Sequence, residues 1–266
     1  MPLVSVEVDH TGVATLTLRR PAARNALSME LCDAIVGGLE EIDGNGSARV
    51  VILAGEGKVF CSGADFAAVS GPDALDFLPA FERMLEAVAH FRLPVIARIQ
   101  GAALGGGLQL ASVCDFRVID EDANVGIPSS RLGIVINFEN VQRLVVLVGA
   151  ARAKEVLLTA RTFSGAEAVI AGLATSAHPA DGLAAAAAEL AERIAALAPL
   201  SVQGAKRAID AVQSHLGGVR ASSPERAEEI DRLVVEAYNS ADLAEGLRRD
   251  AGETNAGIQR HLIFSS

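Results

Sequence analysis

Cysteine and histidine are scarce in this sequence of 266 residues, and neither is arranged as a binding motif. The three cysteines, Cys32, Cys61 and Cys114, are odd in number and lack paired spacing, which favours a reducing compartment over a disulfide framework. We expect their thiols to be small buried side chains. The five histidines are scattered, without the spacing of HExxH or a similar motif, so we expect no metal site.

Positive charge is also in short supply. Lys and Arg total 23 against 33 Asp and Glu, which gives a formal net charge of −10. This balance argues against a nucleic acid or an anionic membrane surface as the main partner. There is no apolar run long enough to span a bilayer and no basic N-terminal region leading into an apolar stretch. We therefore expect a soluble, cytoplasmic protein with no membrane segment.

Three common catalytic signatures are missing. The chain has no G-x-S-x-G elbow, which argues against a serine hydrolase. Its most glycine-rich stretch lacks both the GK[ST] ending of a phosphate-binding loop and the G-x-G-x-x-G spacing of a dinucleotide fold. The chemistry therefore has to be sought in another arrangement.

The first half of the chain alternates strand and helix patterns. A hairpin pattern covers residues 4–18, a helix capped by Ser28 reaches residue 42, and a buried strand covers residues 49–53. A further helix is expected over residues 80–91, followed by a buried strand over residues 94–99. Because half of the residues are apolar, these elements can enclose a large core of the α/β class.

From residue 137 onward the patterns are mostly helical. Helices are expected over residues 138–148, 153–159, 165–171, 182–197, 202–214, 224–239 and 241–250. Pro199 marks a boundary between a core of residues 1–198 and a helical region of residues 199–266. We expect the helical region to serve assembly, with folding back onto its own core as the alternative.

The stretch of residues 101–115 joins the strand at 94–99 to a helix pattern beginning at Leu108. Between them lie three glycines, residues 105–107, with no side chains to block the approach of a ligand to the backbone. The N-terminus of the helix would present unpaired N–H groups, which suit a developing negative charge such as an oxyanion. The alternative is a tight turn that simply requires glycine.

Several motifs together resemble the crotonase (enoyl-CoA hydratase/isomerase) family, in register over about residues 3–215. The matching segments are residues 20–27 (RPAARNAL), 60–65 (FCSGAD), 101–107 (GAALGGG), 126–128 (GIP), 132–133 (LG), 142–144 (QRL) and 151–159. The resemblance implies a crotonase (ClpP-like) spiral core of repeated ββα units. It also implies that the C-terminal helices mediate a homotrimer or a dimer of trimers.

The resemblance further implies an acyl-CoA ligand and a place in fatty-acid metabolism. Coenzyme A would enter as part of the substrate thioester, with no other cofactor. The backbone N–H groups of Ala64 and Gly106 would form an oxyanion hole for the thioester carbonyl. This agrees with the helix N-terminus inferred from the glycines, because a thioester enolate is an oxyanion that such donors stabilise.

The loop that would cradle the CoA moiety contains Arg24, Ala26 and Leu27. Arg24 and Lys58 are the candidate partners of the CoA phosphates. Both are equally well explained as solvated surface cations.

Two positions depart from the family pattern. Hydratases of the family carry two catalytic glutamates, and here Gln109 and Ser129 occupy those positions. An amide does not titrate usefully and an isolated serine needs a base of its own, so neither replaces a general base. Both can still hydrogen-bond a ligand or a water molecule. These two replacements therefore argue against standard hydration and against double-bond isomerisation.

Asn137 and Glu139 are the remaining candidates near the acyl group. In some relatives an aspartate at the position of Asn137 does chemistry, but asparagine is not a base. Glu139 is the one carboxylate left there, and it is our candidate acid/base residue. The alternative is purely structural: Asn137 caps a helix and Glu139 in the first turn favours the helix dipole.

Two main functional hypotheses remain, together with a third, weaker one. The first is an enzyme of the lyase or isomerase class that acts on an acyl-CoA thioester through an enolate held by Ala64 and Gly106. The second is a non-catalytic acyl-CoA binding protein that retains the scaffold. The third is an ordinary hydratase whose water is positioned by Gln109 and Ser129.

Overall fold

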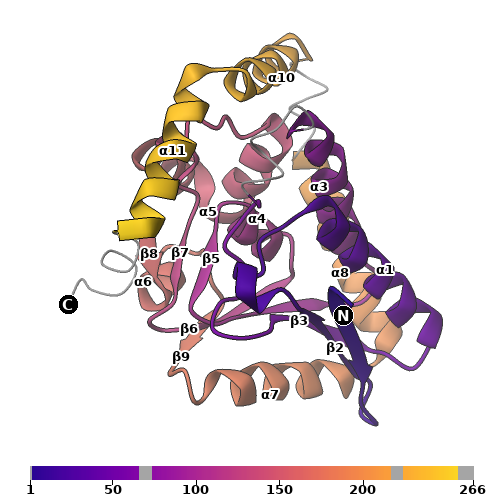
Figure 1. Cartoon of the computed structure of the whole chain (residues 1–266). Coiled ribbons are helices and arrows are strands. Elements are labelled where there is room, and N and C mark those ends of the chain that lie inside the picture. The colour runs from indigo at the N-terminus through magenta and orange to yellow at the C-terminus, as the bar shows by residue number, and fades with distance from the viewer. Residues whose placement is uncertain (1, 66–73, 217–223, 257–266) are drawn as a thin grey trace.

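The computed structural model describes residues 2–65, 74–216 and 224–256, which form strands and helices in alternation followed by helices alone (Figure 1). The strands are β1 (Val4–Val8), β2 (Val13–Leu18), β3 (Val50–Gly55), β4 (Val95–Ile99), β5 (Ala102–Leu104), β6 (Phe116–Asp120), β7 (Asn124–Gly126), β8 (Thr162–Ser164) and β9 (Ser176–His178). The α-helices are α1 (Met29–Asn45), α3 (Ala74–Ala89), α4 (Gly106–Ser112), α5 (Phe138–Thr159), α6 (Gly165–Ile170), α7 (Leu183–Ala195), α8 (Pro199–Leu216), α10 (Pro224–Tyr238) and α11 (Ala241–Ala256).

The larger sheet has six strands in the order β1-β2-β3-β4-β6-β9, and the smaller has three in the order β5-β7-β8. β1 and β2 form the predicted antiparallel hairpin, while β2, β3, β4, β6 and β9 run parallel to one another. In the smaller sheet β5 and β7 are parallel, and β8 is antiparallel to β7. The carboxyl ends of β3 and β4 therefore meet at one edge, where a site is expected in an open parallel sheet.

Helices cover both faces of the larger sheet, so its central strands are apolar on both sides. On one face α1 and α3 contribute Ile35 and Phe81 to a core that includes Leu53 of β3. On the other face α7 packs its alanine-rich side, including Ala187, against Ile52 of β3 (Figure 1). This two-sided burial holds the strand ends in fixed positions beneath the loops that follow them.

The helices after residue 199 fold back on the core within the described residues. Lys206 of α8 is almost fully buried and donates to Asp115, at the start of β6, over 2.7 Å. In α11 a Cβ on Gly246 would lie 2.7 Å from the backbone of Leu132, which shows how closely that helix approaches the core. The role of this region in assembly stays a prediction.

Candidate functional site

The glycine turn between β5 and α4 has a backbone geometry that side chains disfavour. Gly105 has φ +53° and ψ −118°, and its N–H donates to the Gly126 carbonyl over 2.8 Å. A Cβ on Gly107 would lie 2.3 Å from the Cys61 carbonyl oxygen, so no side chain fits there. The turn is therefore held between β7 and the segment that begins at Cys61, and α4 starts at Gly106.

The segment that carries Ala64 runs beside this turn. Leu27 donates its N–H to the Gly63 carbonyl and accepts from the Asp65 N–H, each over 2.8 Å. This parallel bridge uses the groups on both sides of Ala64 and leaves the Ala64 N–H unused. Neither that N–H nor the Gly106 N–H has a backbone acceptor within the described part of the chain. Gly106 N lies 3.5 Å from the position of a Cβ on Gly63, so two spare donors lie close together at the start of α4.

An ion pair ties the Ala64 segment to the loop before it. Nη2 of Arg20 lies 2.9 Å from Oδ2 of Asp65, and both side chains are about three-quarters buried. The same guanidinium donates to the Ala26 carbonyl. The Ala64 segment is thus held from two sides, by this ion pair and by the bridge to Leu27.

The loop of residues 20–27 is built around Asn25, whose side chain is fully buried. Its Oδ1 accepts the Arg20 N–H over 2.9 Å, and its Nδ2 donates to the carbonyls of Val59 at 2.7 Å and Glu56 at 3.0 Å. Arg24 and Asn25 have φ values of +52° and +53°. Left-handed geometry at two successive non-glycine residues persists only where surrounding contacts fix it, and the Asn25 bonds supply them.

The residues predicted to contact CoA all lie in or beside this loop. Ala26 and Leu27 are buried, whereas Arg24 and Lys58 are exposed. The Ser62 N–H donates to the Arg24 carbonyl over 3.1 Å, so the loop adjoins the Ala64 segment. Arg24 thus lies on the loop that adjoins the Ala64 segment, and Lys58 directly precedes Val59, whose carbonyl accepts from Asn25.

Gln109 and Ser129 are both buried, with exposed fractions of 9% and 8%. Gln109 lies in α4, one turn after the glycines, and lines a small cavity between α4, β7 and α5. The cavity is lined by Gln109, Ser112, Ile127, Asn140, Arg143 and Leu144. Ser129 begins a short 3₁₀ turn, where its carbonyl accepts the N–H groups of Leu132 and Ile134.

Asn137 is the N-cap of α5, as the structural alternative supposes. Its Oδ1 accepts the Asn140 N–H over 3.1 Å, and its Nδ2 donates to Oε1 of Glu82 over 2.9 Å. Both groups of the Asn137 amide are therefore already engaged. Glu139 lies half-buried in the first turn of the same helix.

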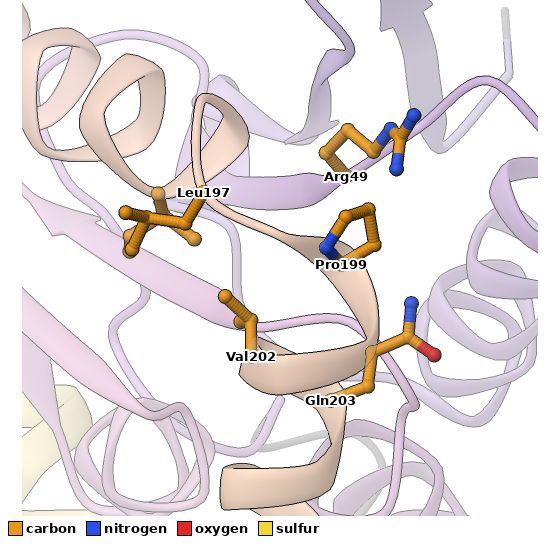
Figure 2. A pocket seen from close by; sticks show the side chains of 6 residues that line it. Arg49, Leu197, Pro199, Val202 and Gln203 are labelled. Carbon is orange, nitrogen blue, oxygen red and sulfur yellow. The ribbon is translucent and has the colours of Figure 1, made fainter.

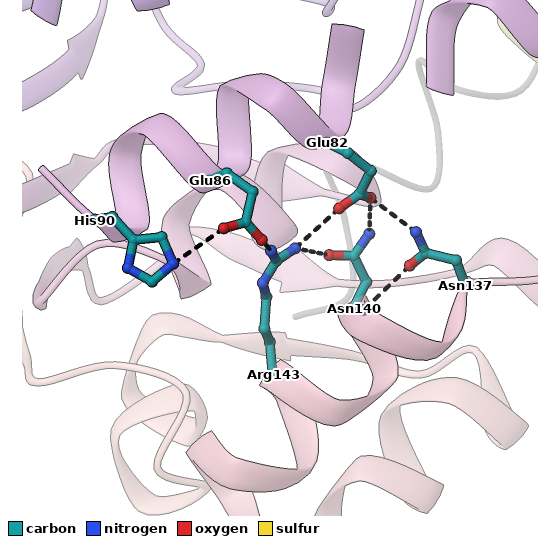
Figure 3. A network of polar contacts seen from close by, with 6 residues as sticks. All are labelled: Glu82, Glu86, His90, Asn137, Asn140 and Arg143. Atoms are coloured by element: carbon teal, nitrogen blue, oxygen red, sulfur yellow. Dashed lines mark hydrogen bonds and ion pairs between the residues drawn. The ribbon is translucent and has the colours of Figure 1, made fainter. Parts of the chain in front are cut away.

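Glu82, in α3, is the carboxylate that sequence reasoning missed. It accepts from Asn137 and Asn140, and its Oε2 lies 3.1 Å from Nη1 of Arg143 (Figure 3). Arg143 also pairs with Glu86, which in turn pairs with His90. Glu82, Glu86 and His90 recur at every fourth residue, which predicts that they share one helix face. Their partners lie on α5, more than fifty residues away, and no sequence pattern near Glu82 predicts that contact.

The three cysteines are unsuited to nucleophilic chemistry. Burial raises the pKa of each thiol, Cys32, Cys61 and Cys114, to about 12. Within the described ranges, no cluster of three or more His, Cys, Asp or Glu side chains could hold a metal ion. In the same ranges, no helix is long and apolar enough to cross a membrane.

A second small pocket lies at the opposite edge of the sheet, where β3 begins. It is lined by Arg49, Ile194, Leu197, Pro199, Val202 and Gln203, between the end of α7 and the start of α8 (Figure 2). Arg49 is its only charged residue, and none of the predicted site residues lies there. The pocket is therefore separate from the candidate site.

Comparison with known proteins gives a consistent result. A model described as enoyl-CoA hydratase/isomerase matches residues 9–249. A Mycobacterium leprae protein named as a probable enoyl-CoA hydratase is 36% identical over 238 residues, which are 88% of this chain and 90% of that protein.

Solved structures agree. A crystal structure of an enoyl-CoA hydratase/isomerase from Xanthobacter autotrophicus Py2 has a TM-score of 0.83 at 30% identity and covers 99% of both chains. A methylmalonyl-CoA decarboxylase in complex with 2-nitronate-propionyl-CoA has a TM-score of 0.84, covering 94% of this chain and 96% of that one; at 21% identity it shares the fold. The predicted resemblance and the crotonase fold are confirmed, whereas the trimerisation region stays a prediction.

Proposed function

Because the chain belongs to the enoyl-CoA hydratase/isomerase family, we propose that it is an enzyme of the lyase or isomerase type acting on an acyl-CoA thioester. The observation that carries the proposal is the pair of spare backbone donors, Ala64 N–H and Gly106 N–H, at the start of α4. Both would donate to the thioester carbonyl oxygen. Their effect grows as negative charge develops on that oxygen, which stabilises an enolate over the ground state.

The proposed step is removal of a proton from the carbon next to the thioester carbonyl. The C–H bond breaks, its electron pair forms a C=C bond, and the carbonyl π pair moves onto oxygen between the two donors. Glu139 is the proposed acceptor of the proton. Gln109 and Ser129 take no part in proton transfer, because neither side chain is a base near neutral pH.

Coenzyme A would lie along the loop of residues 20–27. Arg24 and Lys58 are exposed and would bind its phosphates, and Ala26 and Leu27 would shape the loop beneath it. A structural neighbour carries a CoA compound, which supports this class of ligand. We also propose a cytoplasmic homotrimer or dimer of trimers.

The second candidate function is non-catalytic acyl-CoA binding. The favouring observation is that both positions of the family's glutamates carry groups that do not titrate, and that the Asn137 amide is already engaged. Such a protein would bind the thioester through the same two donors without moving a proton.

Exchange of the α-protons of butyryl-CoA in D₂O separates the two candidates, since it reports enolate formation without requiring a net reaction. We expect exchange with the wild-type protein and at least 100-fold slower exchange with Glu139→Gln, in line with the usual worth of a general base. Glu41→Gln on the exposed face of α1 is the matched control.

Saturable binding of butyryl-CoA without exchange would favour the binding protein over the enzyme. Exchange that survives in Glu139→Gln would remove the role of Glu139. A lack of binding to any acyl-CoA would contradict both candidates.

A further inference from the structure

Two neighbouring residues of α3 contact the two halves of the proposed site. A Cβ on Gly106 would lie 3.3 Å from Cε2 of Phe81, so this ring packs against the backbone that carries one of the two spare donors. Glu82, the next residue of α3, binds the start of α5 instead (Figure 3). One helix therefore lies against both the proposed oxyanion hole and the turn that carries Glu139.

Glu82 binds α5 through three side-chain donors. Its Oε1 accepts from Nδ2 of Asn137 over 2.9 Å and from Nδ2 of Asn140, and its Oε2 lies 3.1 Å from Nη1 of Arg143. Residues three apart are neighbours on a helix surface, so these donors form one face of α5. Asn140 is buried, and the side chains of Glu82 and Arg143 are about three-quarters buried, so water competes little for these bonds.

The same contacts fix the N-terminal cap of α5. Asn137 accepts the Asn140 N–H at its Oδ1 over 3.1 Å, so the amide that caps the helix is also bound by Glu82. Asn140 in turn accepts from Nη1 of Arg143 at its own Oδ1 over 2.7 Å. Because each amide has both its oxygen and its nitrogen bonded, neither can rotate without breaking two hydrogen bonds.

The first turn of a helix depends on such contacts for its position. Its N–H groups lack acceptors within the helix, and helix ends open more readily than helix interiors. Glu139 lies in this turn, directly before Asn140, and successive residues are about 100° apart around the axis. Glu139 is therefore beside the face that Glu82 binds, and a movement of that face would move Glu139 with it.

We propose that Glu82 is a positioning residue for proton transfer: it holds the first turn of α5 so that the Glu139 carboxylate keeps its place relative to the two backbone donors. This inference rests on the proposed function. Proton transfer requires such control, because a displacement of about 1 Å can cost about 100-fold in rate. Glu82 itself takes no proton, since both of its oxygens already accept hydrogen bonds.

Glu82→Ala, which removes all three contacts, tests the proposal by exchange of the α-protons of butyryl-CoA in D₂O. At saturating thioester we expect exchange at least tenfold slower than in the wild type. The dissociation constant from calorimetry should stay within about threefold, because the backbone donors are unchanged. Both are measured well below the midpoint of thermal unfolding, where a loss of stability alone does not lower the saturated rate.

Glu82→Gln is the rescue variant. Its amide oxygen can still accept from Asn137 and Asn140, while Arg143 keeps its pairing with Glu86. We therefore expect its saturated exchange rate to stay within about threefold of the wild type. If Glu82 were the proton acceptor, Glu82→Gln would lose as much as Glu82→Ala, because an amide is not a base. Equal losses in the two variants would overturn the positioning role.

Glu86→Gln is the matched control. Glu86 lies one turn further along α3 and pairs with the same guanidinium, beyond the contacts to Asn137 and Asn140 (Figure 3). Its replacement should leave the saturated exchange rate and the affinity within about twofold of the wild type. A loss as large as that in Glu82→Ala would assign the effect to the charge at Arg143 and overturn the inference.

The remaining outcomes separate this inference from the proposed function. A wild-type saturated rate in Glu82→Ala, or weaker binding as its only effect, would overturn the inference and leave the proposed enzyme standing. Undiminished exchange in Glu139→Gln would also overturn it, because Glu82 is proposed to act through Glu139. A wild-type protein that binds butyryl-CoA without exchanging its α-protons would contradict both the enzyme and the inference.

Discussion

At the scale of single residues, we predict that Gln109 and Ser129 decide which reactions the proposed site can catalyse. Both are buried, and the family resemblance predicts that they stand where hydratases carry glutamates. Their groups can hold a ligand but cannot take a proton near neutral pH. We therefore predict that this family scaffold carries side chains that do not serve standard hydration.

Replacing both residues by glutamate tests this reading. We expect the wild-type protein to hydrate crotonyl-CoA at a rate near background, and Gln109→Glu/Ser129→Glu to hydrate it at least 100-fold faster, because two groups able to transfer protons are restored. Loss of the crotonyl-CoA absorbance in the ultraviolet measures the rate. Rapid hydration by the wild type, or none by a folded double variant that binds the thioester, would contradict it.

Some residues of the site could be read from the sequence and others could not. The helix N-cap at Asn137 was readable because capping depends on the next three residues alone. The contacts of Glu82 could not be predicted from the sequence, because its partners lie on another helix and only tertiary packing brings them together. The hydrogen bonds of the Asn25 side chain could not be predicted for the same reason, since its acceptors are the carbonyls of Glu56 and Val59.

At the scale of elements, α4 packs directly against the segment before Ala64 because a glycine lies at their contact. Gly107 faces the Cys61 carbonyl so closely that any side chain must push the two apart. The pair of spare donors depends on this contact, because one lies on each of the two segments. The geometry of the proposed oxyanion hole is thus a packing property of two elements.

Gly107→Ala should therefore disturb both stability and binding. We expect a loss of about 1–3 kcal/mol in the free energy of unfolding, as for an overpacked core, together with at least tenfold weaker binding of butyryl-CoA. Gly37→Ala is the matched control, since Gly37 is exposed in α1 with open space around its Cβ position. It should stabilise the protein by about 0.5–1 kcal/mol. Urea unfolding followed by circular dichroism and calorimetric titration measure the two effects.

Wild-type stability and affinity in Gly107→Ala would show that the segments can separate without consequence.

Element boundaries were predicted less well than element types. The strands at β3 and β4 follow directly from their β-branched apolar runs, and both are buried and parallel. The helix expected to begin at residue 80 in fact begins at Ala74 and contains Pro79, which a sequence pattern treats as a boundary. Phe77 and Phe81 stack on each other one turn apart in this helix, and burial of both rings in the core outweighs that local preference.

At the scale of the whole molecule, the question is how firmly the helices after residue 199 belong to the core. Nζ of Lys206 in α8 donates to Oδ2 of Asp115 over 2.7 Å and to the Leu93 carbonyl over 3.1 Å. The same Asp115 oxygen accepts the Val95 N–H over 2.7 Å. One buried lysine thus joins α8 to the starts of both β4 and β6.

Lys206→Met tests whether α8 unfolds with the core. Removing one partner of a buried pair leaves Asp115 uncompensated, and because Asp115 is one-quarter exposed we expect a loss of about 2–4 kcal/mol. Lys154→Met, at an exposed position of α5, should change stability by less than about 0.5 kcal/mol. Urea unfolding followed by circular dichroism suits a chain without tryptophan.

The number of urea-unfolding transitions in Lys206→Met shows whether α8 unfolds together with the sheet. A single transition shifted as a whole in Lys206→Met would mean that α8 and the sheet unfold together, so that the predicted boundary near Pro199 separates roles and not folding units. Two transitions, with only the first shifted, would mean that the C-terminal helices form a unit of their own. A midpoint equal to that of Lys154→Met would show that the buried lysine contributes no net stability to the docking of α8.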